Sequence, residues 1–333
     1  MEKLSIEVQK YGAAKDLVVR RSSDVVQPQG HQILIDVHYS GVNFADIVMR
    51  LGFYRDAPPR PFTPGYEVSG VVRSVGSQVT RFKVGDRVIA GTRFGGYTNQ
   101  ALVDDWQVFH LPKGLDLKEA AALPVNYITA YIALEEFGRI RKGDRILMDC
   151  ATGGVGVIAM QMAARKGATV VGLTTTASKK AFIESYGAKA YTFEEFEKSG
   201  EKNFDFILNS SGGSSLKRQY LLLNRSGKIV CIGVQSGIQD GKRSLFRFLK
   251  AALSTPWFPV LKLTMQSRMA GGFNALSYFD DQQWMTKHLV GMEDCEFKPH
   301  VGEVFAAEEA WKAHEALEQK RAKGKVLLQW AQS

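Results

Sequence analysis

The chain has 333 residues, of which 45% are hydrophobic and 23% charged, so its length suits two domains and its composition excludes a chain that is disordered throughout. Lysine and arginine outnumber aspartate and glutamate by 43 to 34, and the net charge of +9 suits anionic ligands such as phosphates. The cysteines, Cys150, Cys231 and Cys295, are too few and too scattered for a disulfide framework, which favours a reducing compartment and a cytoplasmic location.

The order of the predicted elements indicates two kinds of domain. From residue 31 to about 110, valine and isoleucine runs are broken by glycines at close intervals, which is typical of a mostly β domain. From about residue 120, a helical stretch precedes apolar strands that alternate with helices as far as 228–233, which predicts a parallel sheet covered on both faces. The segment 297–330 returns to strand, helix and strand, and we assign it to the first domain. No apolar leader and no run of about 18 apolar residues occurs, so we expect neither secretion nor a membrane span.

A glycine-rich turn follows the first apolar strand of the second domain. RILMDC at 145–150 leads at once into glycines and an amphipathic helical pattern, in which Gly154, Gly156 and Ala159 fit G-x-G-x-x-G/A and Gly153 adds room. Small residues let the backbone approach a pyrophosphate while the amides at the helix N-terminus face the anion. A purely structural turn is the alternative, but the strand, the helix and the following βα units favour dinucleotide binding.

The end of the next strand indicates which dinucleotide binds. Enzymes that prefer NAD usually carry an acidic residue about 20 residues beyond the turn. Here the strand at 168–173 is followed instead by hydroxyl and ammonium groups, at Thr174, Thr175, Thr176, Ser178, Lys179 and Lys180. We therefore predict NADPH as the cofactor, because these groups attract a 2′-phosphate. A solvated helix start is the alternative interpretation of the two lysines.

The sequence offers no convincing metal site or nucleophile. Cys150 and Cys231 lie at or within apolar strands, as core thiols do, and the six histidines include no H-x-x-x-H pair, so we predict no bound metal. The nucleophile motif G-x-S-x-G is also absent. Hydride transfer needs neither, because the nicotinamide carries the chemistry and the protein orients an electron-poor acceptor.

These motifs together resemble the zinc-free quinone oxidoreductase branch of the medium-chain dehydrogenase/reductase superfamily, to which ζ-crystallin belongs. Within the branch, NFAD and VNYITAY look especially like the VAT-1 group of synaptic vesicle membrane proteins. In zinc-dependent relatives a cysteine ligand and G-H-E stand where this chain has Ser40 and G-Y-E at 65–67. Besides the glycine turn, the resemblance rests on GVNFADIVMRLGFY (41–54), PFTPGYEVSGVVRSVG (61–76), KVGDRVIA (83–90), AAALPVNYITAY (120–131) and GKVLLQW (324–330).

The resemblance implies an α/β fold with a GroES-like domain at residues 1–120 and 265–333 and a Rossmann domain, a doubly wound parallel sheet, at 121–264. It implies a zinc-independent oxidoreductase that transfers a hydride from NADPH to a quinone or activated enone, with the cofactor in the cleft between the domains. It also implies a homodimer paired through the nucleotide domains. The cofactor-binding residues that it implies are Asn43, Thr129, Gly153, Gly154, Val155, Gly156, Thr175, Lys179, Gly233, Val234, Phe273 and Asn274.

Four residues are candidates for the catalytic pocket. The resemblance places Asn43 against the nicotinamide and substrate, although an ordinary turn residue is the alternative. Asp46, Tyr54 and Tyr127 are further candidates, because tyrosines can stack on a flat quinone and donate a hydrogen bond. Interdomain packing is the alternative for these three.

Three departures from the family bear on the substrate and the cofactor. Val48 stands where ζ-crystallin-like enzymes have a tyrosine, Glu194 stands where a tyrosine or histidine often lies near the adenosine phosphate, and D-x-x-G becomes N-S-S-G at 209–212. A 2-enoyl-thioester reductase is the second enzymatic interpretation, and Val48 argues against it because such an enzyme usually needs a tyrosine donor.

A basic and apolar segment at 240–268 supports a different class of function. Its lysines and arginines alternate with leucine, phenylalanine and Trp257, which suits contact with an anionic membrane surface. A VAT-1-like, lipid-associated nucleotide-binding protein with little turnover is therefore an alternative function. The structural interpretation of the same segment is a basic helix and loop that cover the cleft and pack a dimer. We expect no nucleic-acid partner, because no recognition motif occurs.

Overall fold

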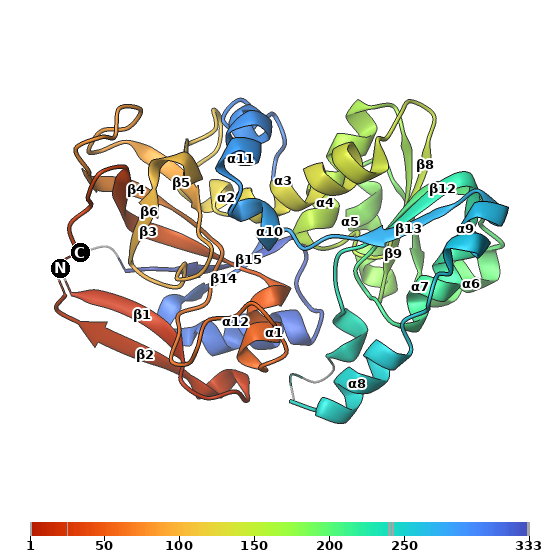
Figure 1. Ribbon diagram of the computed structural model, residues 1–333, viewed down its shortest axis with the longest axis horizontal. Coiled ribbons are helices and arrows are strands. Elements are labelled where there is room, and N and C mark those ends of the chain that lie inside the picture. Colours follow the sequence, from red (N-terminus) through yellow and green to blue (C-terminus); the bar gives the residue numbers. More distant parts are fainter. Residues whose placement is uncertain (1, 25, 239–240, 242, 332–333) are drawn as a thin grey trace. The chain divides into compact units, whose positions relative to one another are not determined.

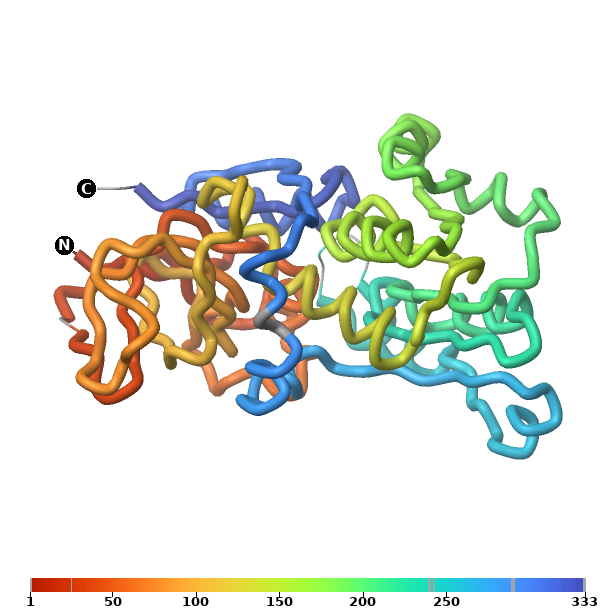
Figure 2. The backbone as a smooth tube through the Cα atoms, turned by 90° about the horizontal axis from the view of Figure 1, so that it is seen from above, coloured from red at the N-terminus to blue at the C-terminus, as the bar shows by residue number. Residues whose placement is uncertain are grey.

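The computed structural model describes residues 2–331 except 25, 239, 240 and 242, and except the side chains of 289 and 290 (Figure 1). The chain divides into two compact units. The first unit is Met1–Asn126, Asp240–Arg243 and Leu276–Ser333, and the second unit is Tyr127–Gln239 and Ser244–Ala275. The two ends of the chain therefore fold together, and Figure 2 shows the blue C-terminal segment beside the red and orange N-terminal strands. In the part of the chain described, no helix is long and apolar enough to cross a membrane.

The first unit contains a seven-stranded sheet in the order β14-β15-β3-β4-β5-β7, with β6 paired to β3, and a separate β1-β2 pair. Its strands are β1 (Lys3–Val8), β2 (Leu17–Ser22), β3 (Gln32–Val42), β4 (Glu67–Val75), β5 (Arg87–Gly91), β6 (Gln100–Asp104), β7 (Val108–His110), β14 (Val301–Ala306) and β15 (Lys325–Gln329). Its helices are α1 (Phe44–Arg50), α2 (Leu117–Ala120), α10 (Leu276–Phe279), α11 (Gln282–Leu289) and α12 (Ala310–Glu318). Short turns are η1 (Ala14–Asp16), η2 (Asp105–Gln107), η6 (Val290–Met292) and η7 (Ala307–Glu309).

The main core of the first unit packs against this sheet. Ile33, Ile35 and Val37 of β3 are buried together with Val68 of β4 and Trp330 after β15. Leu34 of β3 and Leu327 of β15 are buried as well, so both faces of these strands are covered. The C-terminal segment contributes Trp330 and Leu328 to the same core.

The second unit contains six parallel strands in the order β10-β9-β8-β11-β12-β13. They are β8 (Arg145–Met148), β9 (Thr169–Thr174), β10 (Lys189–Thr192), β11 (Phe204–Asn209), β12 (Leu223–Cys231) and β13 (Met269–Gly272). The helices are α3 (Pro124–Tyr131), which starts in the first unit, η3 (Ile132–Gly138), α4 (Gly154–Arg165), η4 (Ala177–Lys179), α5 (Lys180–Glu184), α6 (Phe193–Ser199), α7 (Ser214–Tyr220), η5 (Gln235–Gly237), α8 (Leu245–Leu253) and α9 (Val260–Gln266).

Apolar strands make the centre of this second sheet. Leu147 of β8, Ile207 of β11 and Ile229 of β12 are each at most 1% exposed, as expected of strands covered by helices on both faces. The predicted α/β fold class, a GroES-like β domain with a Rossmann-like parallel sheet, is confirmed. β13 lies in this sheet, beyond residue 264 where we placed the limit of the Rossmann domain; the exact domain limits stay a prediction.

Candidate functional site

The strand order of the second unit marks where a dinucleotide binds in such sheets. Numbered along the chain, the strands run 3-2-1-4-5-6, so the winding direction reverses between β8 and β11. Open parallel sheets bind ligands beyond the carboxyl ends of their strands at this reversal. β8 ends at Met148, and the glycine-rich turn follows it directly, so the turn lies at the reversal.

Close packing in this turn explains its glycines. A Cβ added at Gly156 would lie 2.3 Å from the carbonyl oxygen of Cys150 and 2.7 Å from the Cα of Ala151, so only glycine lets α4 approach the turn. Gly153 is the N-cap of α4, and a Cβ added there would have its nearest neighbour at 3.5 Å. The amides at the start of this helix form a cradle that fits a pyrophosphate.

The end of β9 carries hydroxyl groups and a buried lysine. Thr175 is exposed, whereas Lys179 is only 7% exposed. Lys180 has a partner elsewhere, because its Nζ lies 2.9 Å from Glu195. Because Lys179 is buried, it does not fit the alternative interpretation, in which this lysine lies in solvent at the start of a helix. No acidic residue occurs at 174–183, so the segment after β9 carries no negative charge that would repel a 2′-phosphate.

A buried carboxylate that we did not single out from the sequence joins the ends of β8 and β11. Asp149 is 7% exposed; its Oδ1 accepts a hydrogen bond from Ser210 N at 2.7 Å, and its Oδ2 accepts one from Asn209 Nδ2 at 2.9 Å. These bonds hold the N-S-S-G loop at 209–212, where the family has D-x-x-G. The signal in the sequence was an acidic residue at the end of the apolar strand that leads into the glycine turn.

The other predicted cofactor residues of the second unit follow β12 and β13. Gly233 and Val234 come directly after β12, and Val234 is 42% exposed. Phe273 and Asn274 follow β13, and the ring of Phe273 stacks on Phe137 with centroids 5.3 Å apart. The structure thus places all four at the carboxyl ends of these two neighbouring strands.

The two predicted pocket tyrosines belong to different units. Tyr127, on α3 in the second unit, is 6% exposed and stacks on Tyr131 at 6.1 Å. Thr129, on the same helix, is 7% exposed. Tyr54, in the first unit, is half-buried, and its ring centroid lies 6.5 Å from that of Tyr66. Both tyrosines therefore take part in aromatic contacts within their own units.

Asn43 is held by two buried charged groups of the first unit. Its Nδ2 donates to Glu67 Oε1 at 3.0 Å, and its Oδ1 accepts from Lys325 Nζ at 2.6 Å. Glu67 and Lys325 also form an ion pair, and they are 0% and 3% exposed. The second carboxylate oxygen of Glu67 accepts from Val125 N at 2.8 Å, at the start of α3. Both charged residues lie within motifs that carried the resemblance, but their spacing along the chain offers no reason to link them.

Asp46 is a buried carboxylate behind Asn43. It is 0% exposed, and it accepts hydrogen bonds from Asn43 N at 2.8 Å, Gly65 N at 3.0 Å and the Tyr97 hydroxyl at 3.0 Å. Burial raises the pKa of Asp46 to about 7, while these hydrogen bonds lower it. The Tyr97 hydroxyl also lies 3.1 Å from Nε2 of His314, whose pKa burial holds well below its ordinary value. Asp46 therefore holds the backbone of Asn43 through its hydrogen bond to the Asn43 amide.

Ser40, which stands where zinc-dependent relatives have a cysteine ligand, makes two hydrogen bonds within the first unit. Ser40 is 0% exposed; its hydroxyl donates to Gly96 O at 2.6 Å and accepts from Trp330 Nε1 at 2.8 Å. Among the residues described, no three histidines, cysteines or acidic residues gather where they could hold a metal ion. The absence of a bound metal stays a prediction.

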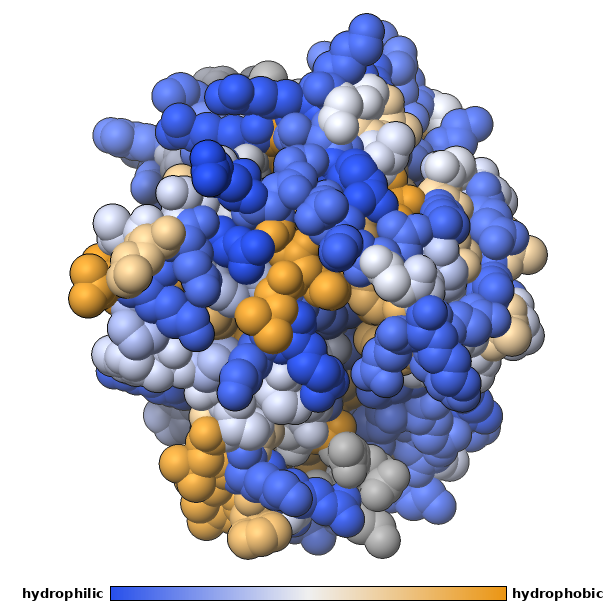
Figure 3. Space-filling model, turned by 90° about the vertical axis from the view of Figure 1, so that its right-hand side faces the viewer, coloured by the Kyte–Doolittle hydropathy of each residue, from blue (hydrophilic) through white to orange (hydrophobic). Residues whose placement is uncertain are grey.

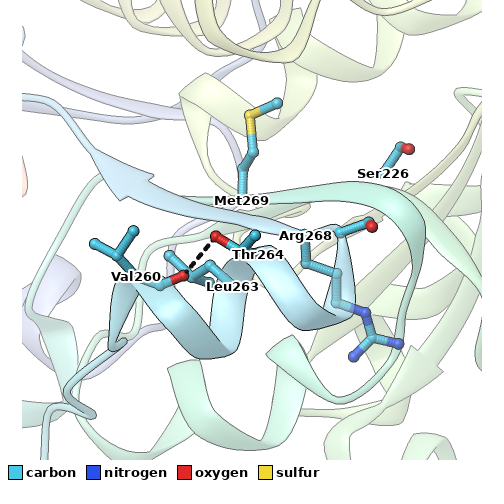
Figure 4. A pocket seen from close by; sticks show the side chains of 7 residues that line it. Ser226, Val260, Leu263, Thr264, Arg268 and Met269 are labelled. Atoms are coloured by element: carbon cyan, nitrogen blue, oxygen red, sulfur yellow. Dashed lines mark hydrogen bonds between the residues drawn. The ribbon is translucent and has the colours of Figure 1, made fainter.

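Part of the second unit carries an exposed apolar surface, which we call the α8–α9 surface. Figure 3, which faces the side that carries α9 and β13, shows apolar patches among hydrophilic ones. A groove of about 320 Å³ lies on this surface, between α9 and the start of β13 (Figure 4). The apolar residues of the surface are between 49% and 88% exposed, and they are Leu245, Phe246, Leu249, Leu253, Trp257, Val260, Leu261, Met265 and Met269.

Two family models and many known proteins match this chain. Residues 29–113 match the alcohol dehydrogenase GroES-like domain, and residues 184–328 match the zinc-binding dehydrogenase family. The human synaptic vesicle membrane protein VAT-1 homolog is 33% identical over 319 residues, which are 90% of this chain and 79% of that protein. The Danio rerio homolog is 33% identical over 310 residues, and the match spans 64% of its length. Human quinone oxidoreductase is 30% identical over 334 residues, 97% of each chain.

Solved structures agree with these matches. Escherichia coli quinone oxidoreductase complexed with NADPH superposes with a TM-score of 0.81 at 25% identity, over 98% of this chain and 99% of that one. A human VAT-1 homolog-like protein has the same fold, with a TM-score of 0.82 at 23% identity over 100% and 99% of the two chains. The chain therefore belongs to the medium-chain dehydrogenase/reductase superfamily, in which its relatives are VAT-1 homologs and quinone oxidoreductases.

Proposed function

We propose that this protein transfers a hydride from NADPH to a quinone or an activated enone. The observation that carries the proposal is the arrangement in the second unit: a glycine turn at the reversal of the sheet, next to a strand end that has a buried lysine and no acid. The relatives that are named quinone oxidoreductases support the same reaction class. The resemblance supports the zinc-independent form of the chemistry.

In this proposal, residues of the second unit bind the cofactor and residues of the first unit orient the acceptor. The amides of Gly154, Val155 and Gly156 hold the pyrophosphate, and Thr175 and Lys179 hold the 2′-phosphate. When bound, NADPH supplies the hydride. In the first unit, Asn43 orients the acceptor through its side-chain amide, while Tyr54 contributes aromatic surface for a flat ring. Solvent supplies the proton that the reduced acceptor needs.

Steady-state oxidation of NADPH tests this proposal, with NADH measured in parallel and phenanthrenequinone and an enoyl-CoA as acceptors. We expect quinone turnover with a strong preference for NADPH. Turnover of the enoyl-CoA alone would favour the 2-enoyl-thioester reductase instead, although Val48 is 6% exposed and offers no donor at the position of the family's tyrosine. Binding of NADPH without reduction of either acceptor would refute the catalytic proposal.

Three further proposals rest on the resemblance and the composition. The first boundary between the GroES-like and Rossmann domains lies near residue 121, and the second lies beyond β13, which pairs with β12 of the parallel sheet. The protein forms a homodimer through its nucleotide domains, which analytical ultracentrifugation tests. It works in the cytoplasm, where its three cysteines stay reduced.

The α8–α9 surface favours a second candidate, association with an anionic membrane surface. Its apolar side chains are too exposed to stabilise this unit. Residues 244–275 of the unit contain no aspartate or glutamate, while Arg247, Lys250, Lys262 and Arg268 carry positive charge. Apolar side chains flanked by cations suit anionic headgroups. The relatives named as synaptic vesicle membrane proteins support this candidate.

Co-sedimentation with vesicles distinguishes this candidate from the first. We expect binding to vesicles that contain phosphatidylserine, little binding to pure phosphatidylcholine, and a loss of binding on Trp257→Glu. Val84→Glu is the matched control, because Val84 is 64% exposed in the first unit. Equal or absent binding to both kinds of vesicle would refute the candidate.

A further inference from the structure

Three strands bring the Asn43 cluster together at one end of the sheet. β15 pairs antiparallel with β3, and Val326 faces Val42, so Lys325, one residue before, falls beside Asn43, one residue after. β4 lies on the other side of β3 and begins at Glu67. The sheet order β15-β3-β4 therefore sets a cation and an anion on the two flanks of one amide.

The chemistry of the two partners fixes the orientation of this amide. A lysine ammonium only donates and an ionised carboxylate only accepts, so Asn43 must turn Oδ1 toward Lys325 and Nδ2 toward Glu67. The amide nitrogen carries two N–H groups, and within the described chain one hydrogen bond from Nδ2 is found, to Glu67. The other N–H stays free to act as a donor. Asn43 is also the partly exposed member of the cluster, while its two partners are buried.

The packing around Glu67 keeps this arrangement rigid. A Cβ added at Gly41 would lie 2.4 Å from Oε1 of Glu67, so the carboxylate fits only over a glycine. Its other oxygen is held by Val125 N. Lys325 is 3% exposed, and breaking a buried ion pair by removing one partner is strongly unfavourable. The amide of Asn43 therefore has little freedom to turn.

We propose that Glu67 and Lys325 are positioning residues, which aim the free N–H of Asn43 at the acceptor oxygen that becomes negatively charged. The proposal rests on the proposed reductase function. The acceptor gains a hydride, one hydrogen with two electrons, from NADPH, which leaves as NADP⁺. Its oxygen becomes an enolate or quinol anion and then takes a proton from solvent. The charge of Lys325 on Oδ1 strengthens the N–H of Asn43 as a donor, and a fixed donor aimed at developing charge stabilises the transition state.

Kinetics of Lys325→Met and Asn43→Ala, alone and combined, test the proposal. We expect each single variant to lower kcat for the quinone by about 10- to 100-fold, with the Kd of NADPH nearly unchanged. In the Asn43→Ala background, Lys325→Met should change kcat by less than about twofold, because both changes remove the same donor. The isotope effect on kcat with NADPH deuterated at the transferred position should rise, since a purely structural loss would not slow the hydride step selectively.

Controls keep the test decisive. Lys325→Arg should restore part of kcat, and Lys312→Met, at a partly exposed lysine paired with Glu309, should leave kcat unchanged. Where Lys325→Met does not fold, Glu67→Gln combined with Lys325→Met removes both charges and should give the same loss of kcat. An active wild type with additive losses, or with an unchanged kcat in Lys325→Met, overturns the positioning role alone. A wild type without turnover overturns the proposed function and the positioning role with it.

Discussion

Gly156→Ala is the sharpest test of the cofactor turn. The added Cβ would lie 2.3 Å from the carbonyl oxygen of Cys150, and an ordinary contact requires roughly 1 Å more. Both neighbours are backbone, so the start of α4 must move away from the turn. Overpacking of this kind costs about 1–3 kcal/mol. If the displaced helix has to return to bind the pyrophosphate, the Kd of NADPH rises by roughly 5- to 150-fold.

Titration of NADPH fluorescence measures this Kd, and thermal unfolding reports on the fold. Gly271→Ala is the matched control, because a Cβ added there in β13 has nothing within 4 Å. Gly153→Ala separates packing from binding: its added Cβ meets the protein only at 3.5 Å, so we expect normal stability but weaker NADPH binding. A folded Gly156→Ala variant with the Kd of the wild type would refute the assignment of this turn to the pyrophosphate.

Two more predictions concern Lys179 and Asp46. Lys179→Met removes a buried cation that follows the end of β9, so the KM for NADPH should rise by about 10-fold while that for NADH stays constant. An equal change for both cofactors in steady-state assays would contradict the 2′-phosphate role. The raised pKa of Asp46, about 7 in the folded protein against an ordinary 3.8, means that the folded state retains a proton between these values. Its contribution to stability is fully present below pH 3.8 and is lost as the pH rises through 7, by roughly 1.4 kcal/mol per pH unit. Urea unfolding at pH 5 and pH 7 should show this loss in the wild type and not in Asp46→Asn, and parallel pH profiles would contradict it.

The fold was predictable because its signals are local. The valine and isoleucine runs of the first unit, the apolar strands between helices and the glycine turn all lie within short stretches of sequence. The position of Gly233 after β12 follows from a predicted apolar strand, whereas Phe273 was named only through the resemblance, because a strand at 269–272 was not predicted.

The Asn43 cluster was not predictable, because it depends on register between distant strands. Lys325 lies 282 positions from Asn43 along the chain, and only the pairing of β15 with β3 brings them together. Composition and spacing cannot show such a contact. The burial of Lys179 was not predictable for a similar reason. A lysine among polar residues is expected to be exposed, and only the packing at the start of α5 shows that it is buried.

The segment from 236 to 270 was the hardest to interpret for a different physical reason. Its apolar residues follow helical spacing in α8, and such spacing ordinarily predicts a face buried against the core. In the structure no residue of α8 or α9 is buried. Hydrophobic periodicity is thus typical of a helix with an apolar face, but it does not identify the surface that covers this face.

The loop that departs from the family's D-x-x-G leads to the last prediction. Asp149, the residue directly after β8, accepts a hydrogen bond at its Oδ2 from Asn209 Nδ2, at the end of β11, at 2.9 Å. One carboxylate therefore still lies between the ends of the two strands, but it follows the neighbouring strand. Asp149→Asn leaves the buried Ser210 N–H with a weaker acceptor, and Asn209→Asp places two carboxylates in contact, where both cannot ionise. We expect each single variant to lose about 1–3 kcal/mol of unfolding free energy.

Exchange of both residues should restore most of that stability, because a single carboxylate and a single amide then face each other again. Urea unfolding of the wild type, the two single variants and the double variant measures the coupling. Gln219 contacts both members of the pair, because it donates to Asp149 Oδ2 at 3.3 Å and accepts from Asn209 Nδ2 at 2.8 Å. Gln219→Ala, which keeps Asp149 and Asn209 themselves, therefore measures the loss of these two flanking hydrogen bonds. A double variant whose loss equals the sum of the single losses would show that Asp149 stabilises β8 alone and does not replace the carboxylate of the family's loop.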